Sequence, residues 1–325
     1  MVNQALPKPQ FEAEDIGQAK GNAHLLDHGF TGLVWFCALS VAIILCWLGF
    51  VVFQDARPAI AKFNLSFLFS QDWTVSENKF GGLPYIYGSI VSSFIALIFS
   101  IPLGLSVAIL TSENLLPQWL KTPIGFMVEL IASIPSVIVG LWGIFVFIPL
   151  FNPLQKWLFA NFSWIPFFNS EPFGPSMLIA GLILAIMILP TIAAISRDVL
   201  LAINPQLRSA SMSLGATRWE TIWRVLLPAA SSGIIGAIIL GLGRALGETM
   251  AVTMVIGNSN VITASLLAPG YTIPAVLANQ FAEAVEELHI GALMYLALIL
   301  FVITLVVNSI AILLVQFINR KRNIA

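Results

Sequence analysis

Six apolar stretches constrain the fold of this chain more than any other feature of its sequence. They cover residues 31–53, 86–110, 124–150, 176–196, 229–256 and 291–318. A helix of about 20 residues crosses the hydrocarbon core of a bilayer, and each stretch is long enough to do so. With 58% hydrophobic and 10% charged residues, the chain has too little polar surface for a water-soluble domain. The sequence therefore predicts an all-α, polytopic membrane protein with six transmembrane helices.

The basic residues predict the orientation of these spans. If the N-terminus is cytoplasmic, the outer segments hold only Arg57, Lys62, Lys79 and Lys156. The inner segments then hold Lys8, Lys20, Lys121, Arg197, Arg208, Arg218, Arg224, Arg320, Lys321 and Arg322. Loops rich in Lys and Arg remain on the cytoplasmic side. We therefore expect a polar cytoplasmic tail over 1–30, a cytoplasmic loop over 197–228 and a basic cytoplasmic tail over 319–325.

Several functional classes are disfavoured by what the sequence lacks. A formal net charge of −1 without a concentrated basic face argues against a nucleic-acid partner. His24 and His28 are four residues apart but lack the carboxylate of a helical metal motif, so no metal site is expected. Cys37 and Cys46 lie in one apolar run, where a helix would hold them too far apart for a disulfide. No nucleophile elbow, Walker loop or dinucleotide motif occurs, so we expect a non-catalytic chain without a bound cofactor.

The segment 197–228 carries the signals of two short helices. Asn204 followed by Pro205 is a typical N-cap with proline at the first helical position. The first helix can run to Leu214, where Gly215 provides the left-handed residue that commonly ends a helix.

A second helix is predicted directly after Gly215. Thr217 and Glu220 have the spacing of a capping box, and Pro228 should end this helix before the fifth span. A rigid hairpin over 205–227 suits contact with a cytoplasmic partner, although a solvated loop remains the alternative. The hairpin carries the basic residues Arg208, Arg218 and Arg224 on the cytoplasmic side of the membrane.

A charge pair is predicted inside the fifth span. Arg244 lies well within the apolar stretch, where an arginine costs at least ~2.5–3.5 kcal/mol on insertion scales. Glu248 is one helical turn later and would lie on the same face. A guanidinium matches phosphate-like oxygens with two parallel donors, and Thr249 could add a hydroxyl. We interpret Arg244, Glu248 and Thr249 as a substrate pathway; a purely structural ion pair is the alternative.

The hairpin resembles the EAA loop of ABC-importer permeases, whose pattern is Glu-Ala-Ala-x3-Gly-x9-Ile-x-Leu-Pro. The matching residues here are Ser209-Ala210-Ser211, Gly215 and Val225-Leu226-Leu227-Pro228. The likeness departs from the pattern at Ser209, which replaces the leading glutamate. The resemblance implies that this loop docks on an ATP-hydrolysing subunit. The coupling residues would then be Ser209, Ala210, Gly215, Arg218, Glu220 and Pro228.

Two further segments make the resemblance more specific. The run from Leu242 to Val252, LGRALGETMAV, is similar to the segment that marks phosphate-specific ABC permeases. The stretches 134–143 and 83–89 resemble the PstC type rather than the PstA type of these permeases. The likeness covers roughly residues 30–320. It implies a type I ABC-importer (MetI-like) permease fold in a bacterial inner membrane, with Arg244 and Glu248 needed for phosphate passage.

The resemblance also implies a set of partners. These are a homologous PstA-like permease as heterodimer, two PstB-like ATPase subunits that carry ATP and Mg, and an extracytoplasmic phosphate-binding protein. Three alternatives remain: a secondary anion transporter driven by an ion gradient, an ABC permease for another oxyanion, and a membrane-embedded enzyme. The first predicts two repeated halves with paired broken helices, and no clear internal repeat is present. The enzyme is disfavoured because the spans carry no metal-ligand or nucleophile–base set.

Overall fold

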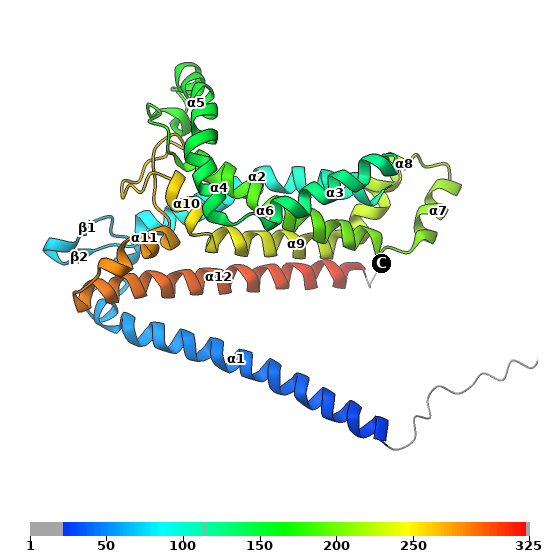
Figure 1. Cartoon of the computed structure of the whole chain (residues 1–325), viewed down its shortest axis with the longest axis horizontal. Coiled ribbons are helices and arrows are strands. Elements are labelled where there is room, and N and C mark those ends of the chain that lie inside the picture. Colours follow the sequence, from blue (N-terminus) through cyan, green and yellow to red (C-terminus); the bar gives the residue numbers. More distant parts are fainter. Residues whose placement is uncertain (1–21, 114, 323–325) are drawn as a thin grey trace, which may run out of the picture. The chain divides into compact units, whose positions relative to one another are not determined.

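The computed structural model describes residues 22–113 and 115–322. Most of the expected tail over 1–30 and the last three residues of the tail over 319–325 therefore lie outside the described residues. Within these residues, six helices are long and apolar enough to cross a membrane, as predicted. Figure 1 shows the helices labelled in chain order.

The helices of 15 residues or more, not all of which could span a membrane alone, have the following bounds. They are α1 (Asn22–Phe63), α2 (Leu83–Ser112), α3 (Gln118–Ser133), α5 (Ile148–Phe162), α6 (Met177–Leu201), α9 (Leu227–Gly247) and α12 (Glu287–Arg322). Shorter helices are α4 (Ser136–Trp142), α7 (Pro205–Ser213), α8 (Arg218–Thr221), α10 (Met250–Val255) and α11 (Ile273–Gln280). Two strands, β1 (Trp73–Thr74) and β2 (Lys79–Phe80), form an antiparallel hairpin. The part of α1 before Val52 forms a unit of its own, and the packing and sites below belong to the unit from Val52 onward.

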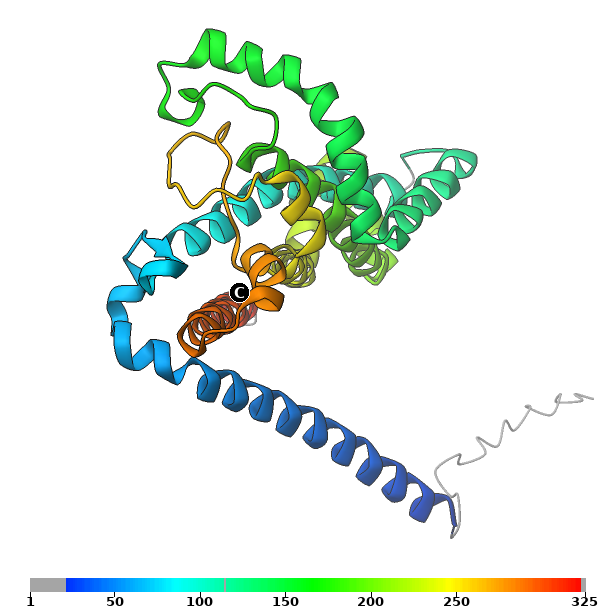
Figure 2. The same ribbon diagram turned by 60° about the vertical axis from the view of Figure 1, so that its left-hand side comes forward.

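Helix α6 lies at the centre of this unit. It packs against α2 and α9, and the three helices lie side by side in Figure 1; Figure 2 shows the molecule turned by 60°. Small residues permit the close approach. A Cβ added to Gly104 of α2 would lie 3.1 Å from Ile192, and one added to Gly181 of α6 would lie 2.4 Å from Ile95. Ile95 of α2 thus meets Gly181 of α6, and Gly104, further along α2, meets Ile192, further along α6. The two helices therefore run parallel.

The third expected span is wrong in its bounds. Residues 124–150 do not form one helix, because α3 ends at Ser133 and α4 begins at Ser136. Ile134 has ψ 125° and lies before Pro135, and the proline ring disfavours helical backbone in the residue that precedes it. The helix that is long enough to span runs instead over Ser136–Phe162, through α4, a π-helical turn at Gly143–Phe147 and α5.

The fifth expected span, over 229–256, also differs. Its helix begins earlier, at Arg218, and ends at Gly247. Pro228 does not end the preceding helix as expected, because a π-helical turn at Ile222–Leu226 leads without a break into α9. The backbone N–H of Leu227 donates a hydrogen bond to the carbonyl oxygen of Ile222, five residues earlier. This wider turn accommodates the proline ring. The same arrangement recurs where the π turn at Gly143–Phe147 precedes Pro149.

The other helix boundaries shift more modestly. Helix α1 already includes residues 22–30 of the expected tail and continues past the expected end at 53. Within the expected loop 197–228, α6 continues to Leu201 and α8 begins at Arg218, which leaves a short connection that contains α7. The segment 261–281 adds no seventh span, because it holds only the eight-residue α11.

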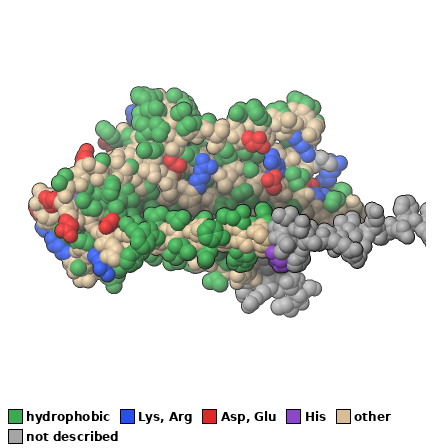
Figure 3. Space-filling model, turned by 60° about the horizontal axis from the view of Figure 1, so that its bottom comes forward, with side chains coloured by type: hydrophobic (Ala, Val, Ile, Leu, Met, Phe, Trp, Pro, Cys, Tyr) green, Lys and Arg blue, Asp and Glu red, His purple; other side chains and the backbone are tan. Residues whose placement is uncertain are grey.

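The two ends of this unit differ in composition. At one end, β1, β2 and α11 enclose an aromatic cluster in which Trp73 contacts Phe80 and Tyr85 edge to face. At the other end lie α7 and α8 (Figure 1). Between the ends, large hydrophobic side chains are exposed along α3, α4 and α12, as lipid or partner contact requires. Figure 3 shows hydrophobic side chains in broad patches of one face.

A close approach between α2 and the segment before α11 gives a stability prediction. An added Cβ at Gly88 would lie 2.0 Å from the carbonyl oxygen of Tyr271, whereas one at Gly236 of α9 would meet nothing within 4 Å. Gly88→Ala should therefore lower the free energy of unfolding by about 1–3 kcal/mol. Gly236→Ala is the control and should leave it equal or higher, because alanine favours a helix. Thermal unfolding in detergent measures both; equal midpoints would contradict the close packing at Gly88.

Candidate functional site

Arg244 lies in the last turn of α9, next to a break in the helix. Its Nη1 donates a hydrogen bond of 3.3 Å to Oγ1 of Thr191 on α6. A cation at the C-terminal end of a helix also interacts favourably with the helix dipole. Thr191 was not predicted from the sequence; the signal available for it was a hydroxyl residue directly after Pro190, inside an apolar span.

The predicted pairing of Arg244 with Glu248 is wrong. Helix α9 ends at Gly247, and among the described residues no ion pair joins Glu248 to Arg244, whose guanidinium bonds to Thr191 instead. One carboxylate oxygen of Glu248 instead accepts a hydrogen bond of 3.5 Å from the backbone N–H of Ala251, in the first turn of α10. Thr249 donates to the Gly247 carbonyl oxygen at 3.2 Å. Glu248 and Thr249 therefore form the break between α9 and α10.

A cavity of about 300 Å³ opens beside Arg244. Arg244 is the charged member of its lining, and α3, α4 and α6 supply apolar walls that include Ile134, Trp142 and Met187. In such apolar surroundings a guanidinium attracts an anion more strongly than it does in water. Non-helical backbone at membrane depth is tolerated where it lines a cavity. The breaks at Pro135 and at Glu248 lie near this cavity, so the geometry suits passage of an anion.

The helical hairpin, formed by α7, α8 and the turn between them, has the caps that the sequence predicts. Asn204 caps α7 by accepting from the backbone N–H of Gln206 at 2.9 Å. Gly215 follows α7 with φ +88°, the left-handed conformation expected of it. Thr217 and Glu220 form the reciprocal capping box, with the Thr217 backbone N–H donating to Glu220 at 2.9 Å. These caps make the hairpin a defined structural element.

The hairpin presents three of its six predicted coupling residues around a groove. The groove measures about 520 Å³ and is lined by both helices, with Ala210, Gly215 and Glu220 among its residues. Leu214 also lines the groove and is 89% exposed, so its side chain is accessible to a docking partner. Ser209 is exposed and bonds weakly to the Pro205 carbonyl. The remaining two predicted coupling residues lie elsewhere: Arg218 lines a separate cavity, and Pro228 lies in the first turn of α9.

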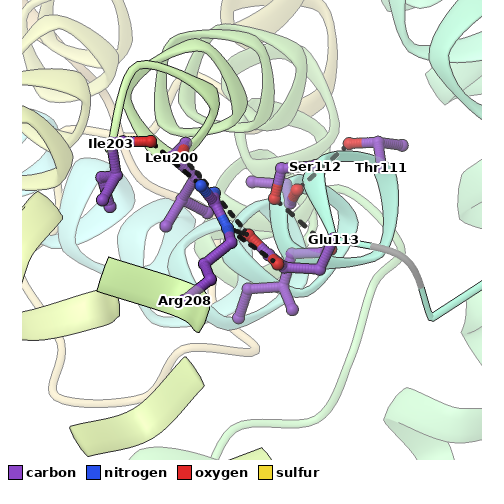
Figure 4. Close-up of polar contacts among 8 residues, drawn as sticks. Thr111, Ser112, Glu113, Leu200, Ile203 and Arg208 are labelled. Atoms are coloured by element: carbon purple, nitrogen blue, oxygen red, sulfur yellow. Dashed lines mark hydrogen bonds and ion pairs between the residues drawn. The ribbon is translucent and has the colours of Figure 1, made fainter. Parts of the chain in front are cut away.

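One ion pair at this end was not predicted. Figure 4 shows Arg208 directed from α7 toward Glu113 at the end of α2. The closest contact, between Arg208 Nη2 and Glu113 Oε1, is 2.8 Å. Arg208 also donates to the carbonyl oxygens of Leu200 and Ile203 at 2.7 and 3.0 Å. Glu113 and Arg208 lie 95 residues apart, so no local sequence pattern predicted their pairing.

Comparison with known proteins identifies the family. A family model described as binding-protein-dependent transport system inner membrane component matches residues 100–324. The chain belongs to this family. It is 42% identical to the phosphate transport system permease protein PstC of Pasteurella multocida over 305 residues, which covers 92% of this chain and 95% of that protein. It is 43% identical to the protein of the same name from Mesorhizobium japonicum, with 88% and 89% covered.

Solved structures of transporters share the fold of this family member. A bacterial alginate ABC transporter in complex with an alginate-bound periplasmic protein matches with TM-score 0.56 and 18% identity, covering 88% of this chain and 96% of that chain. The inward-facing MetNI methionine ABC transporter matches with TM-score 0.54 and 18% identity, covering 72% and 94%. These likenesses confirm the predicted all-α importer-permease fold. The chain is accordingly a multi-pass membrane protein.

Proposed function

We propose that this chain is the PstC-type permease subunit of an ATP-driven phosphate importer. The identity of 42% with a phosphate transport system permease over nearly the whole length carries the proposal. The placement of Arg244 beside a cavity of about 300 Å³ supports it independently, because a guanidinium matches the oxygens of a phosphate bidentately. Nothing in the described part of the chain favours a secondary transporter or a membrane-embedded enzyme.

The cavity suits transient rather than tight binding. Arg244 supplies donors from one side only, while the apolar walls supply none, so an anion is attracted but incompletely coordinated. A site that conducts must bind its substrate strongly enough for entry and weakly enough for release. Glu248 and Thr249, at the adjacent helix break, are the further pathway residues in this proposal. The carboxylate would weaken anion binding by repulsion, and the hydroxyl would add a donor.

The hairpin would couple the pathway to ATP hydrolysis on a separate subunit. In this proposal both termini are cytoplasmic, and α7 docks on one of two PstB-like ATPases, which hold ATP and Mg. A homologous PstA-like permease would complete the pathway, and an extracytoplasmic phosphate-binding protein would deliver the substrate to the opposite end. Closure of the ATPases on ATP would move the hairpin and switch the pathway between outward-facing and inward-facing states.

Replacement of Arg244 tests the pathway. Arg244→Gln should lower phosphate uptake in cells by at least about tenfold while the complex still assembles, because a hydrogen bond to a charged group contributes about 1.5–3 kcal/mol. Arg57→Gln, at an arginine that lies over the Phe53 ring, is the matched control and should leave uptake unchanged. Radiolabelled phosphate uptake measures both variants. Normal uptake by Arg244→Gln would give that arginine a purely structural role.

Replacement of Gly215 tests docking. A Cβ at Gly215 would meet nothing within 4 Å, so Gly215→Ala adds strain only through φ +88°. A left-handed non-glycine residue costs roughly 1–2 kcal/mol, which should change the turn and lower co-purification of the ATPase severalfold. Gly236→Ala is the control. Unchanged co-purification and uptake in Gly215→Ala and in the bulkier Gly215→Val would remove the docking role from the hairpin.

A further inference from the structure

Arg208 joins the helical hairpin to two transmembrane helices at once. Its Nε lies 3.2 Å from both carboxylate oxygens of Glu113, and its Nη2 lies 2.8 Å from one of them. Its remaining donors reach the carbonyl oxygens of Leu200 and Ile203, at and just beyond the end of α6 (Figure 4). We call Arg208, Glu113 and these two carbonyls the Arg208 cluster.

The chemistry of the cluster requires an arginine. The last carbonyls of a helix have no partner within the helix and accept bonds from outside it. One planar guanidinium with five N–H donors can bond a carboxylate and two carbonyls together. A lysine has a single compact ammonium group and cannot reproduce this fork.

The cluster is shielded from water. The Arg208 side chain is 20% exposed and that of Glu113 is 13% exposed. In contrast, Asp198, which pairs with Arg197 at the same end of the unit, has a 66% exposed side chain. Solvent and salt screen an exposed pair of neighbouring residues, whereas a mostly buried pair between helices resists separation.

The position of the cluster gives it a mechanical role. The hairpin has a second connection to the spans, since α8 continues through the π turn into α9. Ser211 and Thr221 join α7 to α8 within the hairpin at 2.9 Å. The Arg208 cluster connects α7 directly to α2 and α6, the closely packed pair that includes Thr191.

We propose that Arg208 is a positioning residue that transmits displacement of α7 to α2 and α6. The inference rests on the proposed function, because it assumes that a partner displaces the hairpin. It adds a defined route, from α7 through Arg208 to the helix that holds the partner of Arg244. Without the cluster, the hairpin would still dock and ATP would still be hydrolysed, but less of the displacement of α7 would be transmitted to α2 and α6.

Two variants of the full transporter complex test this role. Arg208→Lys keeps the charge and removes the fork; Glu113→Gln keeps the shape and removes the charge. Asp198→Asn is the control at the exposed pair. Hydrogen exchange of the α7 amides measures the attachment of the hairpin, and the ratio of phosphate transported to ATP hydrolysed in proteoliposomes measures coupling. Both variants should exchange about tenfold faster in α7 and transport severalfold less phosphate per ATP, with normal ATPase co-purification, while the control matches wild type.

Each other outcome has a defined meaning. Unchanged exchange in both variants would overturn the attachment, and faster exchange with an unchanged phosphate-to-ATP ratio would overturn the transmitting role. Loss of ATPase co-purification would also overturn it, by making the cluster part of docking. If the wild-type complex transported no phosphate, the proposed function would fail, whereas the exchange data would still support or overturn the attachment.

Discussion

The close parallel packing of α2 against α6 is the constraint on which the candidate sites depend. Gly104 and Gly181 leave room for Ile192 and Ile95, and a larger residue at either glycine would separate the two helices. One end of the pair presents Glu113 and the Leu200 carbonyl at the right separation for a single guanidinium. Further along α6, Thr191 lies opposite Arg244. Lipid gives apolar helices little reason to associate, so such steric fit must supply much of the specificity.

Helix breaks give the apolar bundle its polar features. In the bilayer an unsatisfied backbone group costs several kcal/mol, which favours unbroken helices. The chain nevertheless interrupts its helices at Pro135 and at Glu248, close to the cavity beside Arg244. At Pro149 and Pro228 it uses π turns to continue a helix past a proline. The prolines therefore have two different effects, and only the first contributes to the proposed pathway.

The sequence predicted local features better than contacts between distant segments. The caps at Asn204 and Thr217 and the left-handed Gly215 depend on neighbouring residues, and the structure has each of them. The π turn before Pro228 was missed because a proline usually marks the end of a helix. Arg244 was recognised as unusual, but its partner is Thr191 on α6 and not Glu248. Thr191 offered only the weak signal of a hydroxyl after Pro190 and Glu113 offered none, since tertiary packing alone brings both residues to their arginines.

The central claim is that this chain forms a phosphate pathway whose state is linked to ATP hydrolysis elsewhere in a complex. The most direct measurement is ATPase activity of the complex reconstituted with its binding protein, with phosphate and with sulfate as the control anion. We expect that phosphate stimulates hydrolysis and that sulfate does not. Equal ATPase activity with phosphate and with sulfate, or no stimulation by either anion, would contradict the claim.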